Sequence, residues 1–487
     1  MKSVYTARQM RGADAYCEQK LDISSLTLMS KAALALTKVC TKVAAPADKI
    51  LFLCGKGNNG GDGFAAARIL KEMGFTVAVA LLCGREFSPD AAVMFRTVPE
   101  SILTDDLEQI LSCAEEADLV VDCVFGTGFQ GDLPKNVRKV FRAVKEKKIV
   151  ACDIPSGVHC DDGAVSDGAL CADTTVTFAA YKPCFFLYPG KEYCGKVIPA
   201  DIGIPKEALR KQHPGIDLPD EEFVRSLIRP RPENSHKGTF GTLLTVCGSA
   251  DMTGAAYLSA LGALRCGVGL LKMALPRQIV PVLQMKLSEP VFTERKGIVK
   301  ASAVLAGCGM GKDLKALKFA LEQGKPTVLD ADAINVLGEN PELLDEFFHN
   351  NPETEMILTP HPAEFARLMR TSVEKIEADR LTAVRKCLDR WPVTLVLKGH
   401  HTVIASGKRT YINLNGNSGL SKGGSGDVLA GMIASFLAQG YSARDAAVCG
   451  VYLHGAAADL LAESLSEHGF LPSELPTAVA KLLKEFE

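Results

Sequence analysis

Short apolar runs alternate with amphipathic segments along most of this chain, and this alternation restricts the fold more than any other feature. Residues 49–200 carry one such series and residues 241–405 carry a second. Apolar runs of strand length, separated by segments of helical length, are typical of parallel β-sheets covered by helices on both faces. The sequence therefore predicts two α/β domains.

The stretch between the two series, residues 204–235, is rich in proline and charge and shows no strand period. Such stretches commonly join domains, so we place the boundary within it and expect domains at residues 1–212 and 225–487. A chain of 487 residues is long enough for each half to bury a core of its own.

Composition excludes several classes of partner. The formal charge is only -2, so no basic footprint for nucleic acid or an anionic membrane is present. No apolar run reaches the roughly 18 residues that span a bilayer, and the N-terminus lacks the apolar core of a signal peptide. The 16 cysteines form no C-x-x-C pair, and several lie in apolar runs as reduced cysteine does. We expect a cytoplasmic homo-oligomer with small-molecule partners.

The first apolar run ends in a glycine-rich turn, residues 55–63, that opens a helical pattern. Glycines let backbone amides face an anion, and the helix N-terminus adds partial positive charge. The G-x-G-x-x-G in this turn leaves open a hydride-transferring dinucleotide enzyme and a purely structural turn. Glu86 is a poor match for the acidic residue that the dinucleotide fingerprint needs after the second strand.

Two further strand ends are unusually polar: DCVFGTGFQGD at residues 122–132 and DIPSG at residues 153–157. Together with NNGGDG at residues 58–63, they resemble the NAD(P)H-hydrate epimerase family, over about residues 5–205. The resemblance implies a Rossmann-like three-layer domain whose opening turn cradles the pyrophosphate of a hydrated nicotinamide cofactor.

The same resemblance implies which residues act in the first domain. It implies that the hydrate contacts Asn58, Asn59, Gly60, Gly61, Asp62, Gly126, Thr127, Gly128, Phe129, Gln130, Gly131, Asp132 and Asp153. It also implies a potassium ion held by Asn59, Asp122 and Ser156, whose oxygens suit that cation. Turn or helix capping is the alternative for Asp122 and Ser156.

Asp153 is implied to lie at the reacting carbon. Inverting a ring carbon that bears a hydroxyl needs proton transfers, and a positioned carboxylate contributes on the order of 10²–10⁴ in rate to such steps. The alternative is that Asp153 only caps the turn before Pro155.

In the second half, the loop Gly423-Gly424-Ser425-Gly426 leads straight into an apolar helical pattern, with Asp427 on its first turn. Converging backbone amides there can hold a transferring phosphoryl group while the carboxylate accepts a hydroxyl proton. A glycine-rich helix start with a capping aspartate is the structural alternative. The chain contains no G-x-x-x-x-G-K-[ST] motif, which excludes a Walker-type NTPase.

This loop resembles the ribokinase-like fold, whose members phosphorylate alcohols with ATP or ADP. Further sequence motifs narrow the resemblance to the NAD(P)H-hydrate dehydratase family. This resemblance covers residues 225–487. These motifs occupy residues 235–249, 252–270, 307–311, 329–335, 359–368 and 398–404.

The second resemblance implies a hydrate site and a nucleotide site. The hydrate is expected at Ala255, Gly309, His361 and Asp427, and the nucleotide at Lys398, Gly399, His400, His401, Thr402 and Gly426. Magnesium is expected on the phosphates, assisted by Asp330, Asp332 or Asn335. A metal pair of His400 and His401 is rejected because adjacent residues on a strand point to opposite faces.

The two resemblances together imply a bifunctional repair enzyme. The first domain would interconvert the R and S hydrates of NADH or NADPH, and the second would dehydrate the S form while consuming ADP or ATP. Two alternatives remain open: a small-alcohol or vitamin kinase in the second half, and a non-catalytic cofactor-binding module in the first.

Overall fold

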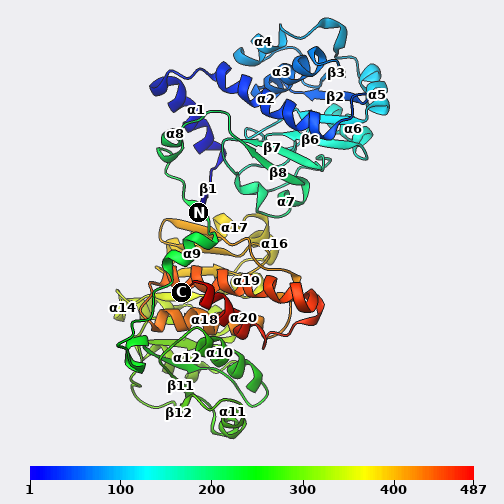
Figure 1. Ribbon diagram of the computed structural model, residues 1–487. Coiled ribbons are helices and arrows are strands. Elements are labelled where there is room, and N and C mark those ends of the chain that lie inside the picture. Colours follow the sequence, from blue (N-terminus) through cyan, green and yellow to red (C-terminus); the bar gives the residue numbers. More distant parts are fainter. Residues whose placement is uncertain (487) are drawn as a thin grey trace. The chain divides into compact units, whose positions relative to one another are not determined.

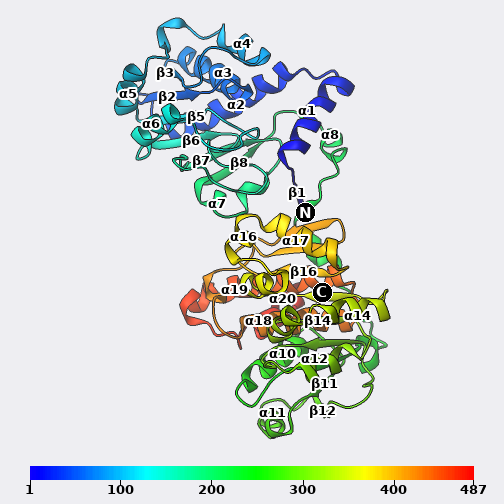
Figure 2. The same ribbon diagram turned by 180° about the vertical axis from the view of Figure 1, so that it is seen from behind.

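The chain forms two compact units. In the computed structural model, which describes residues 1–486, Ser3–Gly215 form an N-terminal unit, and the residues from Ile216 onward form a C-terminal unit together with Met1 and Lys2. Figure 1 and Figure 2 show the elements of each unit from two sides.

The sheet of the N-terminal unit contains seven strands of the described chain, in the order β4-β3-β2-β5-β6-β7-β8. Every neighbouring pair is parallel. The strands are β2 (Lys49–Cys54), β3 (Thr76–Leu81), β4 (Leu103–Thr104), β5 (Leu119–Cys123), β6 (Lys148–Cys152), β7 (Thr174–Phe178) and β8 (Lys196–Ala200). The strand order reverses between β2 and β5, and ligands of open parallel sheets bind outside the carboxyl ends at such a reversal.

Helices cover both faces of this sheet, as the alternating side chains of β2 show. Phe52 and Cys54 pack into a core with α1, α2 and α3, whereas Leu51 and Leu53 pack into a core with α5 and α6 on the opposite face. The predicted three-layer, Rossmann-like arrangement is therefore confirmed. The helices are α1 (Ala7–Leu21), α2 (Ser25–Val43), α3 (Asn58–Glu72), α4 (Pro89–Phe95), α5 (Leu107–Glu116), α6 (Lys135–Val144), α7 (Gly190–Tyr193) and α8 (Lys206–Arg210).

Two glycines at or just before the start of α3, Gly55 and Gly60, lie where neighbouring segments of backbone are in close contact. A Cβ on Gly55 would lie 2.0 Å from the carbonyl oxygen of Val124, and a Cβ on Gly60 would lie 2.1 Å from that of Gly55. Side chains do not approach backbone so closely, so these two glycines let α3 begin directly behind β2. Gly57, the N-cap of α3, has no atom within 4 Å of such a Cβ.

The sheet of the C-terminal unit has the strand order β1-β9-β18-β17-β16-β15-β14-β13-β10-β11-β12. The β16–β17 and β17–β18 pairs are antiparallel. All neighbouring pairs in the run β16-β15-β14-β13-β10-β11-β12 are parallel. The strands are β1 (Lys2–Val4), β9 (Ile216–Leu218), β10 (Thr242–Val246), β11 (Leu270–Ala274), β12 (Val291–Thr293), β13 (Ala303–Ala306), β14 (Thr327–Leu329), β15 (Met356–Leu358), β16 (Thr394–Leu397), β17 (Val403–Ser406) and β18 (Arg409–Ile412).

Helices pack on this second sheet as the predicted α/β arrangement requires. They are α9 (Glu221–Leu227), α10 (Thr253–Arg265), α11 (Val280–Lys286), α12 (Leu314–Leu321), α13 (Asp332–Glu339), α14 (Glu342–Asn350), α15 (Pro362–Met369), α16 (Val373–Ala378), α17 (Arg380–Arg390), α18 (Ser425–Ala438), α19 (Ala443–Gly469) and α20 (Leu475–Phe486). The central helix is α18, in which every residue from Val428 to Ala438 is buried.

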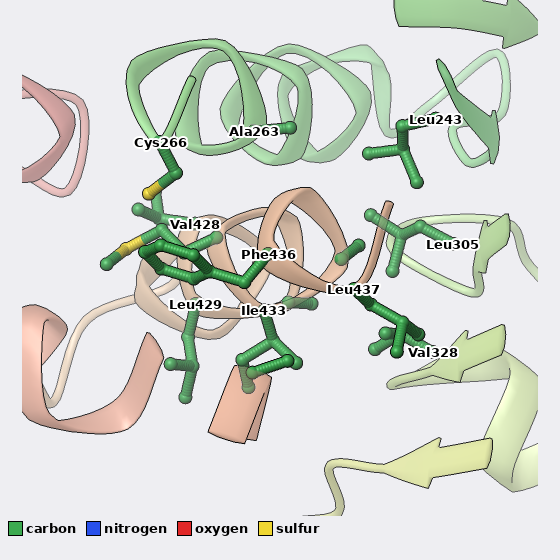
Figure 3. Close-up of a cluster of buried hydrophobic side chains, with 14 of the residues drawn as sticks. Leu243, Ala263, Cys266, Leu305, Val328, Val428, Leu429, Ile433, Phe436 and Leu437 are labelled. Atoms are coloured by element: carbon green, nitrogen blue, oxygen red, sulfur yellow. The ribbon is translucent and has the colours of Figure 1, made fainter. Parts of the chain in front are cut away.

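The backbones of α10 and α18 touch at two glycines. A Cβ on Gly431 would lie 2.0 Å from the carbonyl oxygen of Ser259, and a Cβ on Gly262 would lie 2.5 Å from that of Val428. Apolar side chains of α18 pack in one core with α10 and the sheet, and Figure 3 shows Leu437 on the side of Leu305 and Val328. Ile433 instead lies against α19, where a Cβ on Gly450 would be 2.5 Å from its Cγ1. This packing fixes where α18 begins, which matters for the site described below.

Two details differ from the sequence-based expectation. The proline-rich stretch at residues 204–235 contains the short strand β9, whose Ile216 and Asp217 pair with Thr410 and Tyr411 of β18. The apolar run at residues 393–405 is two strands, β16 and β17, that form an antiparallel hairpin. Within residues 1–486, no helix is both long enough and apolar enough to cross a membrane.

We predict that Gly60→Ala destabilises the N-terminal unit, whereas Gly57→Ala is tolerated. The added methyl group at position 60 collides with backbone, which cannot move aside as a side chain can, and such overpacking typically costs about 1–3 kcal/mol. Urea unfolding followed by circular dichroism measures the difference. Equal stability of the two variants would contradict the backbone contact.

Candidate functional site

A cavity of about 510 Å³ lies at the carboxyl ends of β2, β5 and β6 in the N-terminal unit. The predicted hydrate-binding residues that line it are Asn58, Asn59, Asp62, Gly126, Thr127, Gly128, Phe129 and Asp153. The lining does not include Gly60, Gly61, Gln130, Gly131 and Asp132, so their contact with a ligand stays a prediction. The cavity is thus built where the strand order reverses.

Asp153 follows β6 directly and adopts a left-handed backbone with φ of 64°. Such a conformation is uncommon outside glycine and is often retained at functional sites. Its Oδ1 accepts hydrogen bonds from Lys182 Nζ at 2.7 Å and from Thr177 Oγ1 at 3.3 Å. The carboxyl is buried at the cavity wall beside a buried cation, which is an arrangement suited to proton transfer.

Asp122 and Ser156 lie together at the ends of β5 and β6, fully buried. Ser156 donates its backbone N–H to Asp122 Oδ2 at 2.7 Å and its hydroxyl to Oδ1 at 2.6 Å. Burial raises the pKa of Asp122 to about 6, although the hydrogen bonds from Ser156 act in the opposite direction. Asp122 also accepts the N–H of Val124 at 3.2 Å, so the capping role considered for it is present.

Asn59 has a buried side-chain nitrogen with no hydrogen-bond partner among the described residues. A buried polar atom without a partner costs about 1–3 kcal/mol. An amide turned the other way would present its oxygen instead. Amide, carboxylate and hydroxyl oxygens from Asn59, Asp122 and Ser156 form a donor set that fits a hard cation.

Two more carboxyls border the cavity, Asp62 and Asp14. Burial raises the pKa of Asp62 well above its ordinary value, and the neighbouring charges of Asp153 and Asp14 add to this. Asp14 lies at an exposed position on the cavity rim, where partial desolvation raises its pKa to about 6, with a further contribution from Asp153. Carboxyl groups whose pKa values are raised by different amounts can divide the acid and base roles of a reaction, and the group with the higher pKa is the better proton donor.

The C-terminal unit presents a different arrangement at the start of α18. Gly424 has φ of 103°, a conformation that favours glycine, and α18 begins at the next residue, Ser425. The first backbone N–H groups of a helix have no intrahelical acceptor, and the helix dipole adds partial positive charge there. Asp427 lies in this first turn, so a carboxylate stands beside amides that can hold an anion.

Asp427 belongs to a tight cluster with Cys308 and Asp330, whose ligand atoms all lie within 4.8 Å of one another. Burial raises the pKa of Asp427 to about 6, and the charge of Asp330 contributes in the same direction. Such a carboxyl is largely ionised at neutral pH and still accepts a proton readily.

Lys398 carries positive charge into this cluster. Its Nζ lies 2.6 Å from Asp330 Oδ1, which also accepts the hydroxyl of Thr359 at 2.8 Å. A Cβ on Gly426 would lie 3.3 Å from the same nitrogen, so the ammonium group is next to the start of α18. An anion bound at these amides would therefore also meet Lys398.

His361 is the N-cap of α15. Its Nδ1 accepts the N–H groups of Ala363 and Glu364, and Glu364 accepts the N–H of His361 at 2.8 Å, which completes a capping box. The His361 side chain is 48% exposed, and its Nε2 lies 3.1 Å from Glu364 Oε1. His361 thus has a structural role at the start of α15, and its exposure leaves the ring accessible to a ligand.

The predicted nucleotide-binding residues 398–402 form the loop between β16 and β17. Buried Arg380 holds this loop, because its Nη2 donates to the carbonyl oxygens of Leu397 at 2.9 Å and Lys398 at 3.0 Å. His400 and His401 lie in this loop and not on a strand, and their ring centroids are 4.3 Å apart, so the expectation that they point to opposite faces is wrong.

The remaining predicted residues fall into two groups. Ala255 and Gly309 lie side by side, since a Cβ on Gly309 would be 2.6 Å from that of Ala255. Among the three candidates for magnesium, Asp330 lies beside Asp427, whereas Asp332 accepts the N–H of Gly311 and Asn335 accepts a guanidinium N–H of Arg367.

Sequence reasoning missed three buried polar residues that the structure brings into these sites: Lys182, Thr359 and Glu364. Thr359 directly follows β15, so the rule that ligands gather at strand ends would have found it, whereas Lys182 lies four residues beyond the end of β7. Glu364 stands three residues after His361, which is the spacing of a capping box.

The fold and the two sites are typical of α/β enzymes that bind phosphorylated small molecules at glycine-rich strand and helix ends. Comparison with known proteins narrows this class. Residues 243–481 match the family described as NAD(P)H-hydrate dehydratase, and residues 25–184 match the family described as YjeF-related protein N-terminus. The chain belongs to the family of bifunctional NAD(P)H-hydrate repair enzymes.

Its relatives match over nearly their whole length. The bifunctional NAD(P)H-hydrate repair enzyme of Moorella thermoacetica is 35% identical, covering 99% of this chain and 97% of its own. That of Escherichia coli is 32% identical, covering 99% and 94%. A crystal structure of the Bacillus subtilis ADP/ATP-dependent NAD(P)H-hydrate dehydratase, co-crystallised with ATP and Mg²⁺, is 32% identical and covers 56% of this chain and 99% of its own, with a TM-score of 0.50.

A structure described as a ribokinase-like superfamily protein from Enterococcus faecalis is 25% identical, with a TM-score of 0.50 over 56% of this chain and 96% of its own. The predicted ribokinase-like architecture of the C-terminal unit is therefore confirmed.

We predict that the C-terminal unit loses stability as the pH falls from 6.5 to about 4, because of His454. Burial lowers the pKa of this histidine to about 4, and its Nε2–H donates to the carbonyl oxygen of Ser425 at the start of α18. Below pH 6.5 this histidine binds a proton in the unfolded chain but not in the folded chain. At pH 4 the difference lowers the free energy of unfolding by about 3 kcal/mol.

Urea unfolding at a series of pH values measures this loss. His454→Gln should flatten the dependence between these pH values, whereas His349→Gln, at an exposed position on α14, should leave it as in the wild type. An unchanged slope in the His454 variant would contradict the assignment.

Proposed function

We propose that Asp427 performs the dehydration of the S hydrate and Asp153 performs the interconversion of the R and S hydrates, in two independent sites. The observation that carries this proposal is the position of Asp427, in the first turn of α18 beside the first backbone N–H groups of the helix and Lys398. The family of bifunctional repair enzymes supplies the reaction pair. The residue assignments rest on the contacts described above.

In the dehydration, the added hydroxyl of the hydrate attacks the terminal phosphorus of ADP or ATP while Asp427 accepts the hydroxyl proton. The bond from that phosphorus to its bridging oxygen breaks, and AMP or ADP leaves with the bonding electrons. The amides at the start of α18 and the ammonium of Lys398 stabilise the transferring phosphoryl group. Phosphate then leaves with the electrons of the carbon–oxygen bond, and loss of a proton from the adjacent ring carbon restores the double bond. Phosphorylation thus converts a poor leaving group into a good one.

Magnesium, when bound to the nucleotide, neutralises part of the negative charge of the phosphates. It usually takes only one or two protein carboxylates and keeps several waters. Asp330, whose side chain lies beside Asp427, is the residue that fits this role best.

In the interconversion, Asp153 moves a proton to or from the hydrate in the cavity, and Asp62 is the carboxyl best suited to donate one. Asn59, Asp122 and Ser156 would hold a potassium ion, which would supply positive charge at the carboxyl ends of β5 and β6. A cytoplasmic location and a homo-oligomer belong to the same proposal.

Incubation of hydrated NADPH with the protein, magnesium and either ADP or ATP tests the proposal. Recovery of absorbance at the band of the reduced cofactor is expected, and the R form should react only as fast as it is epimerised. A stable phosphorylated alcohol with no recovery of reduced cofactor would instead indicate a small-alcohol kinase.

We predict that Asp427→Ala lowers dehydration by about 10²–10⁴ while leaving epimerisation unchanged, and that Asp153→Asn has the converse effect, since each removes one proton acceptor. Dehydration is measured by cofactor absorbance, and epimerisation by NMR of the two hydrates without nucleotide. Asp389→Ala, at an exposed position on α17, controls for loss of a carboxylate. Loss of both activities in either variant would contradict separate sites.

We also predict that kcat/KM for dehydration falls about tenfold per pH unit below pH 6, because the raised pKa of Asp427, about 6, leaves it protonated there and unable to accept a proton. The value should be constant above pH 7. Samples returned from low to neutral pH must regain full activity, which separates titration from unfolding. A flat profile from pH 5 to 8 would rule out Asp427 as the titrating base.

A further inference from the structure

The ammonium group of Lys182 uses all three of its hydrogens in the wall of the N-terminal cavity. Its Nζ donates to Asp153 Oδ1 at 2.7 Å, to Thr177 Oγ1 at 2.7 Å and to the carbonyl oxygen of Phe178 at 2.9 Å. The Lys182 side chain is only 2% exposed. An ammonium has three donors, so none remains for a ligand.

The same network divides the two oxygens of Asp153. Oδ1 accepts from Lys182, from the hydroxyl of Thr177 at 3.3 Å and from the N–H of Phe178 at 3.4 Å. Oδ2 has no hydrogen-bond donor among the described residues, and a Cβ on Gly126 would lie 3.4 Å from it. Gly126 lines the cavity, so Oδ2 is the oxygen on the cavity side.

Lys182 is also the buried positive charge of this cavity. The other cations in its lining, Arg11 and Lys56, are exposed, whereas the carboxyls of Asp62 and Asp153 are buried. A buried carboxylate without a cation or hydrogen-bond donors is strongly destabilised. The charge and the three hydrogen bonds therefore act together on one carboxyl group.

We propose that Lys182 is a positioning residue of the epimerase site, which holds Oδ1 of Asp153 so that Oδ2 faces the hydrate. This inference rests on the role proposed for Asp153. The terminal torsion of an aspartate is broad, so an unheld carboxyl group would sample many orientations. Because a misplacement of about 1 Å can cost about 10²-fold in rate, loss of Lys182 should impair catalysis without loss of a substrate contact.

The test compares Lys182→Met with Lys71→Met, which makes the same change at an exposed position on α3. Epimerisation is followed by NMR of the R and S hydrates of NADPH, without nucleotide. For Lys182→Met we expect kcat to fall about 10–100-fold and KM to stay within about threefold of the wild type. Lys71→Met should match the wild type, as should dehydration of the S hydrate by both variants.

Thr177→Val provides a second variant in case Lys182→Met does not fold. It keeps both charges and the side-chain shape, and removes only the hydroxyl that joins Lys182 to Asp153. We expect a several-fold fall in kcat with KM unchanged. Circular dichroism melting curves confirm that each variant is folded, so that a lower kcat does not reflect a smaller folded fraction.

The outcomes separate this inference from the proposed function. Wild-type kcat in a folded Lys182→Met or Thr177→Val variant would overturn the inference while leaving Asp153 in its role. A large rise in KM with kcat retained would also overturn it, because Lys182 would then bind substrate directly. Wild-type epimerisation in Asp153→Asn would instead overturn the proposed function.

Discussion

Contact between backbones, where only glycine fits, determines where both sites form. In the N-terminal unit, Gly60 lies against the carbonyl of Gly55, so α3 begins immediately behind β2. In the C-terminal unit, Gly262 and Gly431 bring α10 against α18 and fix the start of that helix. Each contact sets a helix N-terminus at the edge of a sheet, where its amides can meet an anion. Asp62 belongs to α3 and Asp427 to α18, so this packing also positions their side chains.

The two sites use charge differently. In the N-terminal cavity, the buried Lys182 forms an ion pair with Asp153. Asp62, which lines the same cavity, has a pKa raised well above its ordinary value by burial. At the start of α18, Lys398 neutralises Asp330 while the neighbouring Asp427 remains the group that gains protons near pH 6. An isomerisation needs both a proton donor and an acceptor, whereas phosphoryl transfer needs an acceptor beside a cationic cradle.

The fold could be predicted from the sequence because few folds are compatible with a long series of alternating apolar and amphipathic segments. Short elements escaped prediction: β9 and β12 have three residues each, too few to display a period. The hairpin of β16 and β17 was also missed, since an apolar run does not reveal where the chain turns back.

Residues at strand ends, such as Asp153 and Asp122, could be found because their sequence position places them at the ligand edge. Partners such as Lys182 and Arg380 could not be assigned, because tertiary packing alone brings them to their acceptors. Sequence separations of 29 residues for Lys182 and 18 for the contact of Arg380 with Lys398 leave no local pattern to detect.

The distribution of thiols has a practical consequence for spectroscopy. Most of the 16 cysteines, all in the described part of the chain, are buried as free thiols, and burial raises the pKa of several, including Cys152, so that little thiolate forms. Cys83 and Cys113 are partly covered, while Cys171 is exposed. A maleimide fluorophore would therefore attach preferentially at Cys171, in the loop that precedes β7, without prior removal of the other cysteines.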